Sequence, residues 1–481
     1  VGAKLGQDAI HTSLLAGAIG LAVIILFMII VYRIPGLAAS IALCIYTMLV
    51  LIIINVAGLT FTLPGIAGII LSIGMAVDAN VIIFERIKEE LGTGKTVQSA
   101  MKIGFNKAFS AIFDGNITTL IAAFVLGLKG SGAVKGFAYT LAIGIIVSMF
   151  TALVITRLLL KLFYDFGAKN EQLYGVIKDT KTFNFIGKKN IFFCISAALI
   201  LIGIVTVSVN GARGKGMFNY GLDFKGGTST TVTFNQDYSQ SEIESTIIPD
   251  IVSAIGDSTV QQQKVQGGND VVFKTNNLTI EQREALEKLF TSKYGVEQSS
   301  ILTENISGAV SNEMKTDAVV AVIIATICML LYIWFRFKDI RFAGSAVLAL
   351  LHDVLVVVGF YAVARITLGN TFIACMLTIV GYSINATIVI FDRIRENLGQ
   401  MGKADLAEIV NASISQTMRR SVYTTLTTFI MVVILFILGV SAIREFAAPL
   451  MVGIICGGYS SVCITGALWY VLKKGVKKAD N

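Results

Sequence analysis

The sequence has few charged residues, few prolines and few histidines. Charged side chains make up 15% of its 481 residues, whereas a soluble domain has about 25%. Proline occurs four times and histidine twice. No nucleophile–base pair and no set of metal ligands can be recognised along the chain. We therefore predict that the protein is not an enzyme and binds no metal or cofactor.

Cysteine is also scarce, and it is absent from the one long hydrophilic segment, residues 211–316. This absence excludes a disulfide framework in that segment, and no two cysteines have the CxxC spacing of a metal site. We expect the cysteines to be small apolar packing residues. All of them lie in apolar runs: Cys44, Cys194, Cys328, Cys375, Cys456 and Cys463.

Nucleotide and nucleic-acid binding are not indicated either. The segment "GTGKT", from Gly92 to Thr96, resembles the end of a phosphate-binding loop, but the first glycine of that motif would fall on Glu89. No basic stripe with interleaved aromatic residues indicates nucleic acid. We expect the energy for any transport to come from an ion gradient or from another protein.

The sequence is rich in long apolar runs instead, and 55% of its residues are hydrophobic. Eleven runs approach the ~20 residues that a helix needs to cross a bilayer, which predicts a polytopic α-helical membrane protein. Lys and Arg gather in the loops of one side, so we expect a cytoplasmic C-terminus, an external residue 1 and a further crossing segment before it. The runs are 14–33, 38–57, 65–85, 107–128, 137–160, 190–209, 317–335, 342–363, 372–391, 422–440 and 446–471.

The hydrophilic segment 211–316 lies between the sixth and seventh runs. Its pattern predicts a small βαββαβ domain of the ferredoxin-like type outside the membrane. The expected strands are 222–234, 260–265, 270–274 and 298–304, and the expected helices are 240–255 and 279–294.

The sequence repeats itself at a shift of 307 residues, which lays "GMAVDANVIIFERIKEEL", from Gly74, on "GYSINATIVIFDRIRENL", from Gly381. Each copy supplies five spans in the same direction. A parallel repeat of this kind is typical of transporters, with sites at the interface between the copies. We divide the chain into membrane regions 1–162 and 317–472, a cytoplasmic linker 163–189, a linking span 190–210, the exposed domain 211–316 and a basic tail 473–481.

Four charged residues lie in or beside the apolar runs: Asp78, Asp114, Asp353 (preceded by His352) and Arg420. A charge at the bilayer centre costs roughly 2.5–3.5 kcal/mol on insertion scales, so such groups usually face the bundle interior and have a function. We predict that they form an ion-coupling site. The alternatives are an interfacial anchor for Arg420, a helix-packing hydrogen bond for Asp114 and a purely structural acid for Asp78.

Neutral polar side chains accompany these charges. Threonines in spans bond back to their own helix or, as a second possibility, line a polar path. One of the two asparagines, Asn385, stands in the second repeat where the first repeat has Asp78. The supporting polar residues are Thr118, Thr119, Thr424, Thr425, Asn80 and Asn385.

These motifs resemble those of the fused SecD–SecF family, within the RND superfamily. "TLPGIAGIILSIGMAVDANVIIFERIKEEL" resembles the SecD membrane region, and "GLDFKGGT", "LLHD" and "FAAPLMVG" resemble SecF. The resemblance covers essentially the whole chain. It implies an accessory subunit of the bacterial cell membrane that uses the proton or sodium gradient to complete preprotein export. The implied partners are the Sec channel complex, its associated membrane subunits, the unfolded preprotein and, indirectly, the ATP-driven Sec motor.

The resemblance also assigns roles to single residues. Asp78 matches the SecD acid and Arg420 matches the SecF arginine, while the family's other coupling acid falls on Ala386. Arg420 then lacks its usual counter-ion, and Asp78, Asp114 or Asp353 would have to compensate. The family further implies a first span and a large exposed domain before residue 1.

Two other functions remain open. The first is a small-molecule or lipid exporter of the RND superfamily, which would carry large exposed domains in both halves. The second is a passive scaffold for the translocon, which predicts that Asp78→Asn leaves export intact.

Overall fold

The structure, a computed structural model, describes residues 3–59, 62–130, 133–176, 181–214, 216–258, 260–264, 269–402 and 404–479. Within these ranges eleven helices are long and apolar enough to cross a membrane, which confirms the predicted polytopic α-helical fold. The chain forms two compact units. The small unit contains Phe218–Val320, Thr367–Asn370 and the first residues up to His11, and the helical unit contains the rest.

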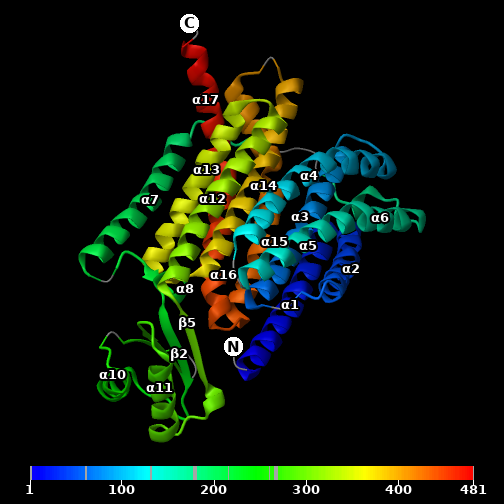
Figure 1. Ribbon diagram of the computed structural model, residues 1–481. Helices are drawn as coiled ribbons and strands as arrows, with labels where there is room; N and C mark the ends of the chain where they lie inside the picture. The colour runs from blue at the N-terminus through cyan, green and yellow to red at the C-terminus, as the bar shows by residue number, and fades with distance from the viewer. Residues whose placement is uncertain are drawn as a thin grey trace. The chain divides into compact units, whose positions relative to one another are not determined.

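The helices form two repeats of five, in the same order along the chain (Figure 1). Each repeat ends with a short π-helical segment that leads into a further helix. The first repeat has α1 (Ala3–Tyr32), α2 (Ile34–Val56), α3 (Leu63–Gly92), α4 (Val97–Lys129), α5 (Ala133–Phe150), η1 (Thr151–Ile155) and α6 (Thr156–Asp165). The second has α12 (Gly308–Phe337), α13 (Ile340–Ala364), α14 (Asn370–Gln400), α15 (Leu406–Leu438), α16 (Ser441–Tyr459), η5 (Ser460–Thr465) and α17 (Gly466–Ala479).

Equivalent helices of the two repeats stop in the same way. At the ends of α4 and α15, the backbone N–H groups of Gly130 and Gly439 donate to the carbonyls of Leu126 and Leu435, at 2.7 and 2.9 Å. Both glycines then continue in an extended conformation, with ψ of 154°. The parallel five-helix repeats predicted from the sequence are therefore present in the structure.

Helices α3 and α14 are the central helices of the helical unit. In each of them 89% of the apolar span is buried, against at most 56% in any other described span. Glycines let neighbouring helices come close: a Cβ on Gly74 would lie 3.3 Å from the Cα of Thr428 on α15, and one on Gly381 would lie 3.3 Å from the Cα of Thr119 on α4. Each central helix thus packs against a helix of the other repeat.

The linking helix α7 (Lys189–Ala212) lies at the edge of the helical unit (Figure 1). Only 11% of its apolar span is buried. It crosses α13 closely, since a Cβ on Gly203 would lie 2.8 Å from the Cα of Gly359. This glycine contact explains how a largely exposed helix is held against the second repeat.

The small unit has the predicted ferredoxin-like fold. Its sheet has the order β3-β4-β2-β5 with every pair antiparallel, and its core is built from alternate strand residues and the apolar faces of the helices. A second, two-stranded parallel sheet joins β1 (Asn219–Tyr220) to β6 (Thr367–Leu368). The strands of the main sheet are β2 (Gly227–Thr233), β3 (Gln261–Lys264), β4 (Asp270–Thr275) and β5 (Ile301–Ile306), and the helices are α9 (Gln240–Glu242), η3 (Ile243–Ile247), α10 (Ile248–Ile255) and α11 (Ile280–Lys293).

The predicted strand 222–234 begins too early. Residues Leu222–Lys225 form a helical turn, α8. The next two residues, Gly226 and Gly227, have φ of +72° and +121°, a conformation that favours glycine and separates the turn from the strand. The last strand starts at Ile301 rather than 298, because Gln298–Ser300 form a 3-10 turn, η4. Residue 265 of the predicted strand 260–265 lies outside the described residues.

Candidate ion-coupling site

Residues at equivalent positions of the two repeats contact each other in the helical unit. The amide Nδ2 of Asn385 donates to Oδ2 of Asp78 at 2.7 Å, and these two residues are 307 positions apart, which is the repeat shift. The rings of Phe137 and Phe446, which also align, have centroids 5.4 Å apart. In a two-fold arrangement, a residue that touches its own equivalent lies on or near the axis. Asp78 and Asn385 therefore lie at the pseudo-two-fold axis between the repeats.

The amide of Asn385 is held in a tight space. A Cβ on Gly115 of α4 would lie 1.9 Å from Oδ1 of Asn385, so any other residue there would displace the amide. This Oδ1 is buried and has no hydrogen-bond partner in the described structure. Asn385 is the one hydrogen-bond partner that the structure describes for Asp78. Both side chains thus retain unused hydrogen-bonding capacity.

Arg420 lies on α15 and lines a small open cavity of about 40 Å³, enough for a few waters at about 10–15 Å³ each. Its Nη2 is buried without a hydrogen-bond partner in the described chain. The carboxylates of Asp78, Asp392 and Glu89 are close enough to act on its charge. The cavity wall is formed by α3, α4, α14 and α15, and it includes Ile82, one helical turn beyond Asp78.

Four charged residues form a closed ring, which we call the ion-pair ring, and three of them, Arg86, Glu89 and Arg393, line this cavity. Arg86 pairs with Glu89 at 2.7 Å and with Glu396 at 2.5 Å, while Arg393 pairs with Glu396 at 3.0 Å and with Glu89 at 3.3 Å. Arg86 is equivalent to Arg393, and Glu89 to Glu396. The ring is therefore a further contact about the pseudo-two-fold axis, and its two cross-repeat pairs connect α3 to α14.

Asp114 belongs to a different cluster. It is 4% exposed, accepts a hydrogen bond from the Tyr332 hydroxyl at 2.8 Å and pairs with Nε of Arg336 at 2.6 Å. Ser110 donates to the same carboxylate. Tyr332 and Arg336 were not predicted from the sequence as partners of Asp114. Their spacing of four residues at the end of a span was the available signal, because it places both on one helical face.

Asp353 forms a third cluster, which shares no residue with the other two. It is fully buried and accepts hydrogen bonds from Ser383 and Ser460. Asp353, which was predicted to group with Asp78 and Arg420, thus lies in a separate environment. Asp114 is connected to the Arg420 cavity through Arg336, whose Nη2 lies 3.9 Å from Oδ1 of Asp392, a residue of the cavity wall.

The six supporting polar residues also lie in different environments. Thr118 and Thr424 bond back to carbonyls of their own helices, those of Gly115 and Ser421, whereas Thr119 bonds both to Gly115 and to Gly381 of the other repeat. Thr425 lines a different, mainly apolar pocket with Phe429 and Tyr459. Asn80 accepts a hydrogen bond from Thr156 at 2.9 Å. Of the six, Asn385 and Thr119 make polar contacts between the repeats.

The fold and this arrangement define a class: a membrane protein of two parallel repeats, with polar groups at the interface between them, which is the plan of many transporters. A family model described as "Protein export membrane protein SecD/SecF, C-terminal" matches residues 1–165 and 285–475. A second, described as "SecD/SecF GG Motif", matches residues 218–237. The chain belongs to the SecD/SecF protein-export family.

Individual relatives agree with this assignment. The chain is 37% identical over its whole length to the protein translocase subunit SecDF of Bacillus subtilis (strain 168) and 38% identical to that of Thermus thermophilus, and it spans 66% and 64% of their lengths. The crystal structure of SecDF, a translocon-associated membrane protein, from Thermus thermophilus matches 98% of this chain with a TM-score of 0.87 at 37% identity, and the chain covers 64% of it. A second SecDF structure, in a "Super-membrane-facing form", matches with a TM-score of 0.77.

Proposed function

We propose that the chain works as an accessory subunit of Sec protein export, using a proton or sodium gradient to complete preprotein translocation, with Asp78 and Arg420 in the coupling site. Family membership supports the export role, because the relatives are named protein translocase subunits. The partners would be the Sec channel complex and the unfolded preprotein. The observation that carries the coupling role is the Asp78–Asn385 hydrogen bond at the pseudo-two-fold axis.

The chemistry follows from the groups at the axis. An ionised Asp78 accepts from Asn385 and attracts the guanidinium of Arg420. When Asp78 takes up a proton or a cation, that attraction is lost. Nη2 of Arg420 and Oδ1 of Asn385, which have no hydrogen-bond partner in the described structure, can then form new contacts. Because these groups belong to both repeats, the change favours a different packing of one repeat against the other. A potential of 100 mV supplies about 2.3 kcal/mol per charge moved.

Two further observations support such a rearrangement. The two solved SecDF structures are both 37% identical to this chain but match it with TM-scores of 0.87 and 0.77, so the relatives have been solved in more than one conformation. The cavity lined by Arg420 offers water and ions an approach to the interface. With the C-terminus on the cytoplasmic side, as we propose, the residues of α3 and α14 that line this cavity lie in the cytoplasmic halves of these helices.

Asp78 is a better candidate for the coupling acid than Asp114 or Asp353. Asp114 is already paired with Arg336, and Asp353 is bonded to two serines. Asp392, on α14, lines the cavity with Arg420 and acts on its charge, although it also pairs with Arg395 at 3.1 Å. We propose it as the counter-ion of the second repeat, where Ala386 supplies none.

The test is preprotein release from membrane vesicles, with and without an imposed proton or sodium gradient. Asp78→Asn keeps the shape of the side chain but not its charge, and it should abolish the gradient-dependent part of release while the protein still assembles. Asp165→Asn, at an exposed position, is the matched control and should behave like the parent. Unchanged gradient dependence in Asp78→Asn, or none in the parent, would contradict the proposal and favour the scaffold.

A further inference from the structure

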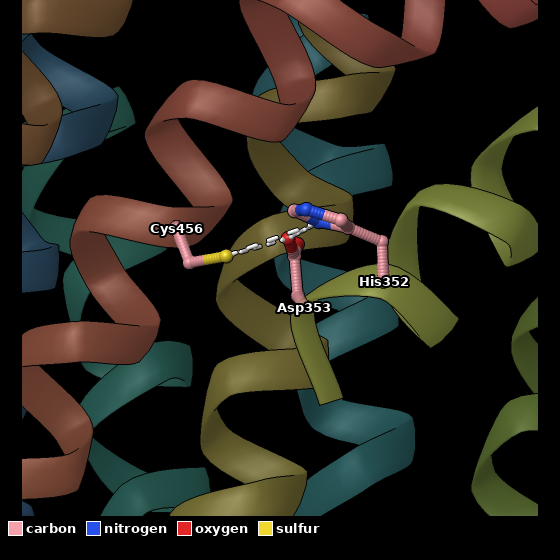
Figure 2. Close-up of side chains that lie close together, drawn as sticks. All are labelled: His352, Asp353 and Cys456. Atoms are coloured by element: carbon pink, nitrogen blue, oxygen red, sulfur yellow. Dashed lines mark hydrogen bonds and ion pairs between the residues drawn. The ribbon is translucent and has the colours of Figure 1, made fainter. Parts of the chain in front are cut away.

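Three side chains with metal-binding atoms converge inside the second repeat (Figure 2). His352 and Asp353 are neighbours on α13, and Cys456 comes from α16. They are 7%, 0% and 6% exposed. The imidazole ring and the thiol both approach the carboxylate of Asp353 (Figure 2). The Asp78 and Arg420 site uses none of these residues.

The separations between the three donor atoms suit a bound cation. Nδ1 of His352 lies 2.9 Å and Sγ of Cys456 lies 3.2 Å from Oδ1 of Asp353, and Sγ lies 3.9 Å from Nδ1. In a tetrahedral zinc site with bonds of about 2.0–2.3 Å, ligand atoms are about 3.3–3.8 Å apart. Shifts of a few tenths of an ångström would therefore bring the three atoms into a tetrahedral shell.

The two oxygens of Asp353 have separate environments. Oδ2 accepts hydrogen bonds from Ser460, at 2.8 Å, and from Ser383. Oδ1 faces His352 and Cys456. Metal-bound carboxylates are commonly oriented in this way by hydrogen bonds to the oxygen that does not bind the metal. The serines thus hold Oδ1 toward the site.

The charges of the cluster also suit a divalent cation. Among the described residues, His352 is the only basic side chain within ion-pair distance of Asp353. A carboxylate, a thiolate and a neutral imidazole together carry two negative charges. A divalent cation would make the buried cluster neutral.

We propose that His352, Asp353 and Cys456 bind a divalent transition-metal cation of the zinc type. The mixed nitrogen, oxygen and sulfur donors select zinc or cobalt over magnesium or calcium, which take oxygen ligands. Binding removes the thiol proton of Cys456 and moves the imidazole proton to Nε2, so that one proton leaves for each cation bound. The cation joins α13 to α16 inside the second repeat.

The experiment is a Co²⁺ titration of the detergent-purified, chelator-treated protein. We expect the visible bands of tetrahedral cobalt together with a thiolate-to-cobalt charge-transfer band, both removed by Zn²⁺, and release of about one proton per cation in weak buffer. Cys456→Ser should lose the charge-transfer band and bind at least tenfold more weakly. Cys463→Ser, in the adjoining η5, is the matched control and should titrate like the parent.

Three results would overturn the proposal: no saturable binding by the parent, a charge-transfer band that survives in Cys456→Ser, or equal losses in Cys456→Ser and Cys463→Ser. His352→Gln serves as a second variant, so that the test does not depend on the folding of one. It should keep the elution profile and metal-free melting temperature of the parent while its affinity for Co²⁺ falls at least tenfold.

Discussion

Asn385 fits at the pseudo-two-fold axis because its neighbour Gly115 has no side chain. Gly115 leaves room for the amide, since a Cβ there would lie 1.9 Å from Oδ1 of Asn385. The amide is therefore pressed between α4 and the carboxylate of Asp78. Any side chain at residue 115 must displace the amide of Asn385, which disturbs its hydrogen bond to Asp78.

We accordingly expect Gly115→Ala to lower stability by about 1–3 kcal/mol, the range for overpacking a tight site. Gly344→Ala is the control, because it is also a helical glycine but its Cβ would meet nothing within 4 Å. The helix propensity of alanine should make that change neutral or stabilising. Thermal unfolding in detergent compares the two, and equal melting temperatures would show that Asn385 is not held as described.

At the scale of elements, the ion-pair ring connects α3 to α14. Its members are partly buried, with side chains 13–28% exposed, and each carboxylate accepts from an arginine of both repeats. Partial burial and the closed arrangement make these pairs stronger than isolated surface pairs, which contribute about 0–1 kcal/mol.

A double-mutant cycle on Arg86→Ala and Glu396→Ala should therefore give a coupling free energy of about 0.5–3 kcal/mol. The same cycle on Arg395 and Asp392, neighbours within α14, should give only about 0.3–0.5 kcal/mol, because Arg395 is 43% exposed. The free energy of unfolding in detergent is the quantity to measure. A coupling for the ring no larger than for the control pair would contradict a role in joining the repeats.

In the small unit, α10 and α11 are joined by Asp250. The hydrogen bonds from the Lys293 ammonium, and then from the Tyr294 hydroxyl, hold the pKa of the Asp250 carboxyl below its usual value. A lowered pKa means that the contact stabilises the fold above the usual carboxyl pKa of about 3.9 and is lost as the pH falls through the lower folded value.

Asp250→Asn should thus speed amide hydrogen exchange in α10 and α11 at neutral pH, by an amount that reflects roughly 0.2–1 kcal/mol for a largely exposed pair. The difference from the parent should shrink below about pH 4. Comparing parent and variant at each pH cancels the intrinsic pH dependence of exchange. A difference that grows as the pH falls would have the wrong sign for this mechanism.

At the scale of the whole molecule, the two repeats have the same fold but carry different charges at the axis. The first repeat supplies Asp78, whereas the second supplies Asn385 and Ala386. The coupling that we propose thus depends on one acid at the axis, and Arg420 lies in a cavity that both repeats line.

Ala386→Asp should add a second acid beside Asn385 and give Arg420 a further counter-ion. We expect the gradient-dependent release of preprotein from vesicles to increase and its pH dependence to change. Ala386→Asn is the matched control, since it adds similar bulk without a charge. If both variants behave alike, the missing acid has no part in coupling.

Much of this fold could be predicted from the sequence. Hydropathy is a property of consecutive residues, so the eleven spans were correctly predicted, and the 307-residue repeat required only a comparison of the chain with itself. The start of β2 was wrong, because the consecutive glycines Gly226 and Gly227 take positive φ and end a helical turn where an uninterrupted strand was expected. Boundaries of this kind depend on backbone conformation, which apolar patterning does not report.

The sequence by itself determined the class of the protein, its repeats and the rarity of its membrane charges, because each of these is set by residue type and order. Only the tertiary structure decided which charges meet. Asp78 bonds to Asn385, Asp114 pairs with Arg336, and Asp353 is surrounded by Ser383, Ser460, His352 and Cys456. Most of these partners come from different helices, 30 to 307 residues apart in the chain. Their contacts depend on how glycine-lined helices pack, and no local pattern encodes that packing.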